Sequence, residues 1–355
     1  MPDKDQTSEL REQVAAAIEQ GTPLKIEGGN SKSFYGRRCE GRKLDTTGHR
    51  GIINYQPKEL VLTVRAGTPL SDVEQELSDK GQFLPFEPPH FSDKATIGGA
   101  VACGLSGPAR AYTGSVRDFV LGMHIINGRS DVLHFGGEVM KNVAGYDVSR
   151  LMTGAFGTLG VILDTSFKVL PRPLVEKTLI LECNVNEAVA KSTALPAQHV
   201  PLSASFHDGA RLYLRLSRTE TAVKESCKRI GGEIMDDDLF WTSVREQTHS
   251  WFQSDQTLWR LSLPAQTRLP DLSGRVSFEW GGALRWLHSD LPATELRQKI
   301  SQVGGHATLM RAAHNESIDD VFHPLSGPLL KLHQRLKQSF DPQSIFNRGK
   351  MYAEF

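Results

Sequence analysis

Several kinds of segment are missing from this chain of 355 residues, and each absence excludes a class of protein. No run approaches the ~18 apolar residues that a membrane-spanning helix needs. The polar N-terminus has no apolar core typical of a signal peptide. No C-x-x-C pair, H-x-x-H pair or H-E-x-x-H motif predicts a clustered zinc or iron–sulfur site. The four cysteines, Cys39, Cys103, Cys183 and Cys227, are scattered along the chain. We therefore expect a cytoplasmic protein without a metal, whose only contact with a membrane would be through a partner.

The charge balance gives no indication of a nucleic-acid partner. Lys and Arg together number 41 and Asp and Glu together number 41, so the formal net charge is zero. Proteins that bind nucleic acid usually carry a basic surface. The length exceeds what one compact core usually needs, so two domains are expected.

Short strands and helices alternate in the first half of the chain. Leu10, Val14 and Ile18 recur at helical spacing before Gly21, which predicts a first helix and its end. A second helix is predicted with Thr68 as N-cap and Pro69 at its first position. Between and after them we predict strands at 24–27, 52–55, 61–66, 119–126, 131–135 and 161–170, with an Asn-Gly hairpin turn at 127–128.

The second half has a different composition, because glycine becomes rarer and all five tryptophans lie there. Strands are predicted at 179–183, 211–216, 258–263 and 275–279, with helices at 220–230 and 325–340. This pattern is typical of an antiparallel α+β domain. Most of the tryptophans are expected in the core. For Trp251 and Trp286, which have polar neighbours, a surface for a partner subunit is the alternative.

Four glycine-rich segments of the first half could bind a ligand. Residues 28–33, Gly-Gly-Asn-Ser-Lys-Ser, follow a strand and offer consecutive backbone N–H groups, neutral donors and one positive charge, which suits a pyrophosphate. Residues 88–99 offer the Thr96 hydroxyl and the amides of the Ile97-Gly98-Gly99 turn. The other two segments are 114–118 and 154–162. Each alone is weak evidence, and the first alone is more typical of an ordinary turn, whereas their order and spacing together are more specific.

Together these segments resemble the FAD-binding domain of the vanillyl-alcohol oxidase/p-cresol methylhydroxylase (PCMH) superfamily, from about residue 20 to 175. The resemblance implies an α+β protein with a PCMH-type FAD-binding domain of two α/β subdomains over 1–175. It also implies an antiparallel-sheet α+β cap domain over 176–324, which contacts substrate or partners, and a C-terminal segment, 325–355, that returns to the FAD domain.

The resemblance also assigns contacts to individual residues. The first two segments would contact the FAD pyrophosphate, the third would lie along the cofactor, and the fourth would place its strand against the adenosine part. Many relatives attach flavin through a His or Cys that the first loop lacks, so we expect non-covalent binding. The residues assigned to FAD are Gly28, Gly29, Asn30, Ser31, Lys32, Ser33, Pro88, Thr96, Ile97, Gly98, Gly99, Gly114, Ser115, Asp118, Gly157, Gly160, Val161 and Ile162.

Further motifs resemble the glycolate oxidase and D-lactate dehydrogenase branch of that superfamily. They are Lys-Asn-Val-Ala-Gly-Tyr-Asp at 141–147 and the closing sequence at 340–350, Phe-Asp-Pro through Asn-Arg-Gly-Lys. The sequence at 280–286, Trp-Gly-Gly-Ala-Leu-Arg-Trp, is similar to the FAD-binding subunits of bacterial glycolate oxidases. This implies a small 2-hydroxy acid such as glycolate as substrate. It also implies a second flavoprotein subunit and an iron–sulfur subunit as partners.

The catalytic residues are not identified by the sequence. Relatives that oxidise 2-hydroxy acids carry an H-x-x-E-H type cluster, which this chain lacks. His288 is a candidate base because imidazole titrates near neutral pH, and Arg285 could bind a substrate carboxylate. A lone histidine is more often structural or solvated, and Arg285 could equally form an ordinary salt bridge or line a subunit interface. Three functions therefore stay open: an electron-transferring FAD subunit of a complex, a structural FAD-holding subunit without turnover, and a stand-alone FAD-dependent 2-hydroxy-acid dehydrogenase.

Overall fold

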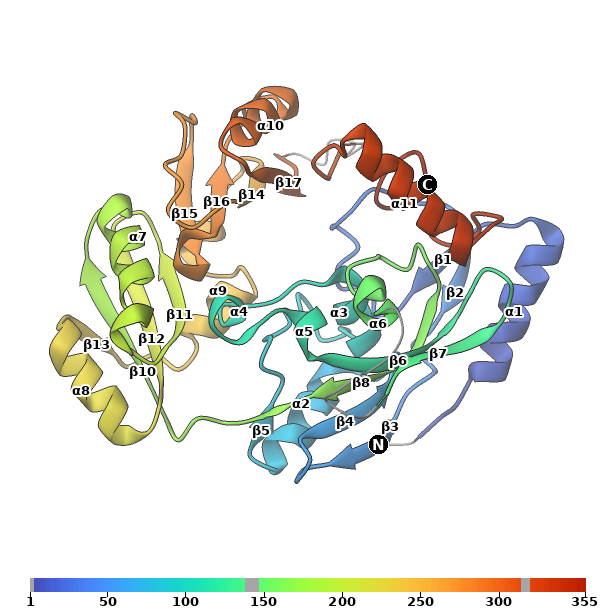
Figure 1. Cartoon of the computed structure of the whole chain (residues 1–355), viewed down its shortest axis with the longest axis horizontal. Helices are drawn as coiled ribbons and strands as arrows, with labels where there is room; N and C mark the ends of the chain where they lie inside the picture. The colour runs from blue at the N-terminus through green and yellow to red at the C-terminus, as the bar shows by residue number, and fades with distance from the viewer. Residues whose placement is uncertain (1–2, 138–146, 314–319) are drawn as a thin grey trace. The chain divides into compact units, whose positions relative to one another are not determined.

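The computed structural model describes residues 3–137, 147–313 and 320–355, and the chain forms two compact units (Figure 1). The first unit consists of Met1–Leu105, Ser115–Pro171 and Pro324–Phe355. The second consists of Ser106–Gly114 and Arg172–His323. The functional division at residues 175 and 324 that the resemblance implies stays a prediction.

A small α/β layer opens the first unit. Strands β1 (Leu24–Glu27) and β2 (Arg42–Asp45) pair in parallel, and helix α1 (Thr7–Gln20) precedes them. The helix buries Leu10, Val14 and Ala17 along one face, as their spacing predicts. It ends at Gly21, whose φ of 60° is in the left-handed region that glycine adopts at little cost.

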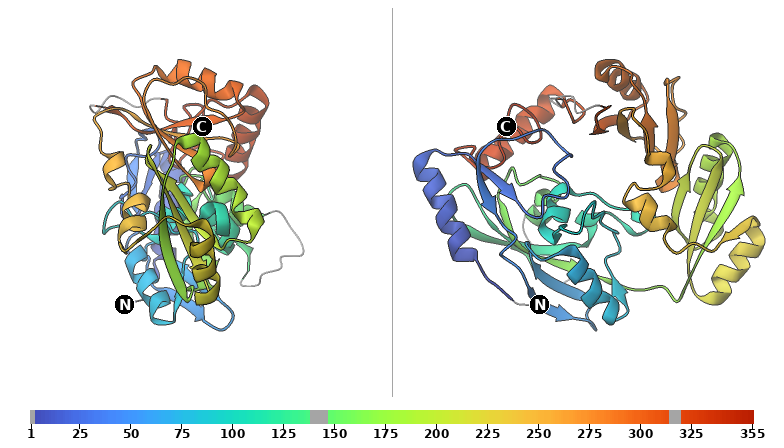
Figure 2. Two further views of the ribbon diagram at one scale, coloured as in Figure 1. Left: turned by 90° about the vertical axis from the view of Figure 1, so that its left-hand side faces the viewer. Right: turned by 180° about the vertical axis from the view of Figure 1, so that it is seen from behind.

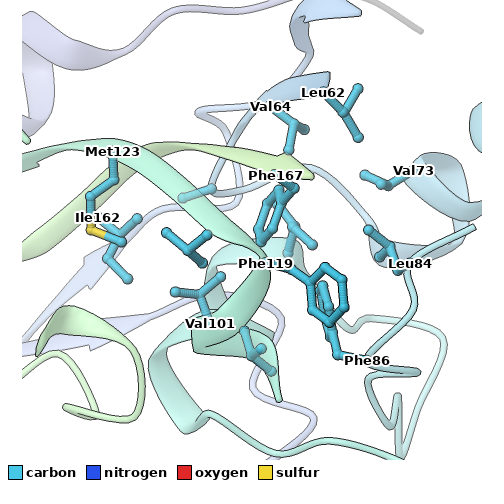
Figure 3. Close-up of a cluster of buried hydrophobic side chains, with 14 of the residues drawn as sticks. Leu62, Val64, Val73, Leu84, Phe86, Val101, Phe119, Met123, Ile162 and Phe167 are labelled. Atoms are coloured by element: carbon cyan, nitrogen blue, oxygen red, sulfur yellow. The ribbon is translucent and has the colours of Figure 1, made fainter. Parts of the chain in front are cut away.

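An antiparallel five-stranded sheet forms the second layer of this unit, and one of its faces carries the hydrophobic core drawn in Figure 3. Phe167 is fully buried in that core, with its ring centroid 5.8 Å from that of Phe86. Each such side chain contributes about 1.5–3 kcal/mol when fully buried. In sheet order the strands are β3 (Ile52–Gln56), β4 (Val61–Arg65), β8 (Val161–Lys168), β6 (Val120–Ile126) and β7 (Val132–Gly136).

Short helices and one further strand pair complete the first unit. The helices are α2 (Leu70–Asp79), α3 (Ile97–Cys103), α5 (Val116–Phe119) and α6 (Val148–Met152). The strand pair is β5 (Gln82–Phe83) with β9 (Leu170–Pro171).

An eight-stranded antiparallel sheet forms the second unit, with helices packed against it (Figure 2). One core surrounds Leu212, Leu214 and Phe278, and another surrounds Trp259 and Leu296. In sheet order the strands are β13 (Glu233–Met235), β10 (Val175–Glu182), β12 (Arg211–Arg218), β11 (Leu202–His207), β15 (Arg275–Glu279), β16 (Leu284–His288), β14 (Leu258–Ser262) and β17 (His306–Arg311). The helices are α4 (Arg110–Thr113), α7 (Val185–Ala194), α8 (Glu220–Ile230), α9 (Phe240–Arg245) and α10 (Ala293–Gln302).

The last helix, α11 (Gly327–Phe340), belongs to the first unit and carries a buried lysine. The Lys337 ammonium donates to Asp341 Oδ2 at 2.7 Å, to the Thr158 carbonyl at 2.7 Å and to the Phe346 carbonyl at 2.8 Å. Asp341 in turn accepts from the N–H groups of Ile345 and Phe346. The ion pair therefore joins the helix, the turn that follows it and the loop before β8.

The predicted α+β class, with its antiparallel sheets, is confirmed.

Two local predictions are wrong. Thr68 is not the N-cap of α2; Pro69 occupies that position, because the Thr68 hydroxyl instead accepts the N–H of Gly51 at 2.9 Å. Trp251 and Trp286 are each only 5% exposed, so they are core residues and not a partner surface; Trp286 Nε1 donates to Glu279 Oε1 at 2.8 Å. None of the described helices is long and apolar enough to cross a membrane.

Replacement of the buried lysine should destabilise the first unit strongly. Lys337→Met leaves the Asp341 carboxylate buried without its cation, and breaking such a pair costs about 3–5 kcal/mol. Lys43→Met, in the exposed pair of Lys43 with Asp45, is the matched control and should change little. Urea unfolding of the two variants checks this, and equal midpoints would contradict it.

Candidate functional site

The loop at 28–33 continues β1, and several of its backbone N–H groups have no acceptor among the described residues. Along β1, the N–H of Leu24 donates to the Ile345 carbonyl and that of Ile26 to Asn347 Oδ1, each at 2.7 Å. Beyond the strand, the N–H groups of residues 28–31 donate to no group of the described chain. Asn30 has a φ of 56°, which turns the backbone there. Successive amides in such a turn form a concavity that suits an anion.

The first and second predicted loops touch each other through their backbones. A Cβ atom added at Gly29 would lie 1.4 Å from the Lys94 carbonyl oxygen. One added at Gly28 would lie 2.6 Å from Thr96 Oγ1. Both positions therefore require glycine, and the structure brings together two segments that are more than 60 residues apart in the sequence.

The second loop contributes less than the sequence predicts. Thr96 caps helix α3, where its side-chain oxygen accepts the N–H of Gly99 at 3.2 Å. The N–H of Ile97 donates to the Thr68 carbonyl, and that of Gly98 donates to the Ala66 carbonyl. The expectation that these three amides are available to a ligand is therefore wrong, because the protein already uses them. Gly98 allows close packing, since a Cβ there would lie 2.6 Å from that of Ala66.

Lys32 joins the first loop to the segment that contains Pro88. Its side chain is only 6% exposed, and its ammonium lies 3.3 Å from Ser31 Oγ and 3.4 Å from the His90 carbonyl oxygen. It also lies 5.8 Å from the centroid of the Phe91 ring. Pro88 itself is buried, and Ser33 closes the turn by donating its N–H to the Asn30 carbonyl.

The third segment is divided between the two units, because Gly114 belongs to the second and residues 115–118 to the first. Ser115 and Asp118 form a capping box at the start of α5, where Asp118 Oδ2 accepts from both the N–H and the hydroxyl of Ser115 at 2.8 Å. Arg117 Nη2 donates to the Thr153 carbonyl at 3.4 Å, which ties this segment to the fourth. The polar atoms of the capping box therefore stabilise a helix end.

The fourth segment lies beside β1 through a residue of the C-terminal segment. Asn347 Nδ2 donates to the Phe156 carbonyl at 2.7 Å, while its Oδ1 accepts from Ile26. Gly157 has a φ of 68°, and a Cβ there would lie 2.8 Å from Asn347 Nδ2. A Cβ at Gly160 would lie 2.7 Å from the Ile126 carbonyl oxygen. This close packing explains both glycines.

Val161 and Ile162 begin strand β8 and are buried on opposite sides of it. Val161 packs in the core that contains α1, and Ile162 packs in the core drawn in Figure 3. Their neighbours there are protein side chains. The branch motif at 141–147 falls largely outside the described residues; its last residue, Asp147, caps α6 by accepting the N–H of Arg150 at 3.2 Å.

The two catalytic candidates lie on β16 in the second unit and are buried. Arg285 donates to the Gly282 carbonyl at 2.8 Å and to the Ala265 carbonyl at 3.1 Å, and burial lowers its pKa to about 10. His288 Nε2 lies 3.1 Å from the Trp251 carbonyl oxygen, and burial lowers the pKa of its imidazole. Both groups thus satisfy backbone carbonyls, which favours a structural role.

The same unit contains a pocket of about 390 Å³. Tyr112, Ser192, Ala265, Trp280 and Gly281 contribute to its wall. The start of the Trp-Gly-Gly motif at 280–286 therefore lines a cavity. Within the described ranges, no group of three or more His, Cys, Asp or Glu side chains is placed to hold a metal ion.

Sequence reasoning missed two residues of the first unit that approach these loops. Asn347 bridges β1 and the fourth segment, and Lys350 lies over the turn that follows the first loop. Both belong to the closing motif at 340–350. A signal was present, since that motif resembles the same branch, but nothing local in it indicates contact with a loop more than 300 residues earlier.

Comparisons with known proteins agree with this geometry. Residues 5–136 match the family described as FAD binding domain. Solved structures of alkyldihydroxyacetonephosphate synthase share the fold, with a TM-score of 0.67 at 14% sequence identity over 97% of this chain and 75% of that one. The predicted PCMH-type FAD-binding fold is therefore confirmed.

The chain is 48% identical to the glycolate oxidase subunit GlcE of Escherichia coli (strain K12) over 99% of its own length and 98% of that protein. It is 27% identical to the glycolate oxidase subunit GlcD of Bacillus subtilis (strain 168), over 63% of this chain and 48% of that one. It is 31% identical to a D-lactate dehydrogenase of Anaerostipes hadrus over 39% of this chain and 29% of that one. The chain belongs to the family of the glycolate oxidase subunit GlcE, and it is an FAD-binding oxidoreductase of that family.

Proposed function

We propose that the first unit binds FAD non-covalently, with the pyrophosphate at the loop of residues 28–33. The observation that carries this proposal is the row of N–H groups at 28–31 that no described protein group accepts, in a loop held by contact with the Lys94 carbonyl and the Thr96 side chain. Because the amides of residues 97–99 are already bonded, we propose that Thr96, Ile97, Gly98 and Gly99 act through shape, not as donors.

We also propose a role at the FAD site for each of the other residues that the sequence assigns to FAD. Lys32 would supply positive charge, and Pro88 and Ser33 would shape the turns around it. Gly157 would let the fourth segment pack closely beside β1 and Asn347, and Gly160 would let it pack against the end of β6. Ser115 and Asp118 would position the start of α5, and Gly114, Val161 and Ile162 would contact FAD through the backbone. The side chain of Val161 is fully buried in the core.

We propose further that the protein is the FAD-binding subunit of a glycolate oxidase complex, in which glycolate or a related 2-hydroxy acid is oxidised to the 2-oxo acid. The similarity to GlcE over nearly the whole of both chains supports this. Bound FAD would supply the redox chemistry, and the protein would position it. The partners would be a second flavoprotein subunit of the GlcD type and an iron–sulfur subunit, in the cytoplasm, with any membrane contact made by partners.

Oxidation of the substrate is assigned to the partner flavoprotein in this proposal. The sequence has no H-x-x-E-H type cluster, and Arg285 and His288 are bonded to backbone carbonyls inside the second unit. The second unit would then act as a cap that contacts partners, and this chain would transfer electrons. The alternatives are a subunit that only holds FAD, and a dehydrogenase that works alone.

The contact between the two loops gives a direct test of the binding site. Gly29→Ala places a methyl group against the Lys94 carbonyl oxygen, so the first loop must move and FAD occupancy should fall at least about tenfold. Gly327→Ala, at a glycine with nothing within 4 Å of the added Cβ, is the control and should keep its flavin. The measurement is the ratio of flavin to protein absorbance after gel filtration. Full occupancy in a folded Gly29→Ala protein would argue against this site.

The site of oxidation can be tested anaerobically with the FAD-loaded chain. We expect its flavin absorbance to stay unbleached when glycolate or D-lactate is added to the isolated chain. When the GlcD-type subunit is also present, we expect bleaching that exceeds what that subunit's own flavin accounts for. Bleaching of the isolated chain at a catalytic rate would instead establish intrinsic dehydrogenase activity. Flavin that stays oxidised even in the reconstituted complex would support a purely structural role.

A further inference from the structure

Lys350 is held in a fixed position over the turn that follows the first loop. The N–H of Arg37 donates to the Lys350 carbonyl at 2.9 Å, and Arg37 Nε donates to the Gly349 carbonyl at 3.0 Å. Gly36 has a φ of 88°, and a Cβ added there would lie 3.4 Å from Lys350 Nζ. The turn at 32–36 therefore passes directly beside the ammonium group.

In the part of the chain that the structure describes, no carboxylate pairs with this ammonium. Across the described ranges, Lys350 Nζ has no hydrogen bond or ion pair. The nearby acidic groups are the thiols of Cys39 and Cys103, whose pKa values are raised by burial, and Glu27. Glu27 is already paired with Lys25 at 2.6 Å. Lys350 thus brings a positive charge to a partly buried position, at a cost that the protein itself does not offset.

The surroundings of Lys350 indicate what would offset that cost. Lys350 Nζ lies beside Gly36, and the turn at 32–36 begins at Lys32, whose own ammonium lies 3.3 Å from Ser31 Oγ in the first loop. This turn directly follows residues 28–31, whose N–H groups donate to no group of the described chain. Two cations next to a row of backbone donors suit a ligand with two negative charges in close proximity, which is the character of a diphosphate.

We propose that Lys350 binds the diphosphate of FAD, so that the C-terminal segment supplies one of the positive charges of the cofactor site. This rests on the proposed function, and it adds a residue from the opposite end of the chain to the loop at 28–33. Asn347 acts as a positioning residue, because its bonds to Ile26 and Phe156 fix the turn that leads to Lys350.

Calorimetry with the full chain, stripped of flavin, tests the proposal through three ligands: FAD, ADP and riboflavin. ADP carries the diphosphate without the isoalloxazine ring, and riboflavin carries the ring without phosphate. Lys350→Met should weaken binding of FAD and of ADP by a similar factor of at least about tenfold, because a charge-assisted bond is lost. Binding of riboflavin should be unchanged. Lys350→Arg, which keeps the charge, should retain most of the FAD affinity.

Lys25→Met is the matched control, since Lys25 lies in the same region but is already paired with Glu27. It should change FAD affinity less than about twofold, and thermal melts should show that all variants fold. The proposal is overturned if Lys350→Met binds FAD as tightly as the control. It is also overturned if Lys350→Met weakens FAD but not ADP, which would place Lys350 at the flavin ring. A wild-type chain that binds neither FAD nor ADP would overturn the proposed function itself.

Discussion

The arrangement of the first unit depends on the buried ammonium group of Lys337. It reaches three acceptors on three separate stretches of chain: the loop before β8, the end of α11 and the C-terminal turn. A buried charge is tolerated only when it is paired and fully hydrogen-bonded. Because all three acceptors must be present together, the C-terminal segment is held against the fourth glycine-rich segment. This places Asn347 against β1 and Lys350 against the turn that follows the first loop.

A second constraint is the closeness of the first and second loops. At Gly29 there is no space for even one methyl group, so the backbone of the first loop lies directly on that of the second. In the second loop, the N–H of Gly99 donates to the Thr96 side chain, and the N–H groups of Ile97 and Gly98 donate to the carbonyls of Thr68 and Ala66. The second loop, fixed by these bonds, supports the first loop. The first loop therefore keeps N–H donors available for a ligand, and the second loop holds the first loop in place. This fits a dinucleotide cofactor bound by a rigid backbone surface.

Much of the fold could be predicted from local patterns. The buried stripe of Leu10, Val14 and Ala17 is typical of an amphipathic helix. The Asn-Gly turn at 127–128 indicates the hairpin of β6 and β7. Strand β16 was missed because all five of its residues are buried, so that its sequence lacks the alternation of a half-exposed strand. The role of Thr68 was mistaken because Gly51, which is 17 residues earlier, competes for its hydroxyl.

For the candidate site, the sequence indicated which segments lie at the cofactor site. It did not indicate which of them keeps its N–H groups available and which of them supports the others. Nothing in the sequence around Ile97 or Gly98 shows that their N–H groups already bond to the protein, and Lys350 lies too far along the chain for sequence spacing to connect it with Gly36.

The most direct test of the whole account is acid precipitation of the purified chain, followed by analysis of the flavin. The account predicts FAD in stoichiometric amount, all of it released into the supernatant. A chain that carries no flavin when folded, or flavin that stays with the precipitated protein, would contradict it.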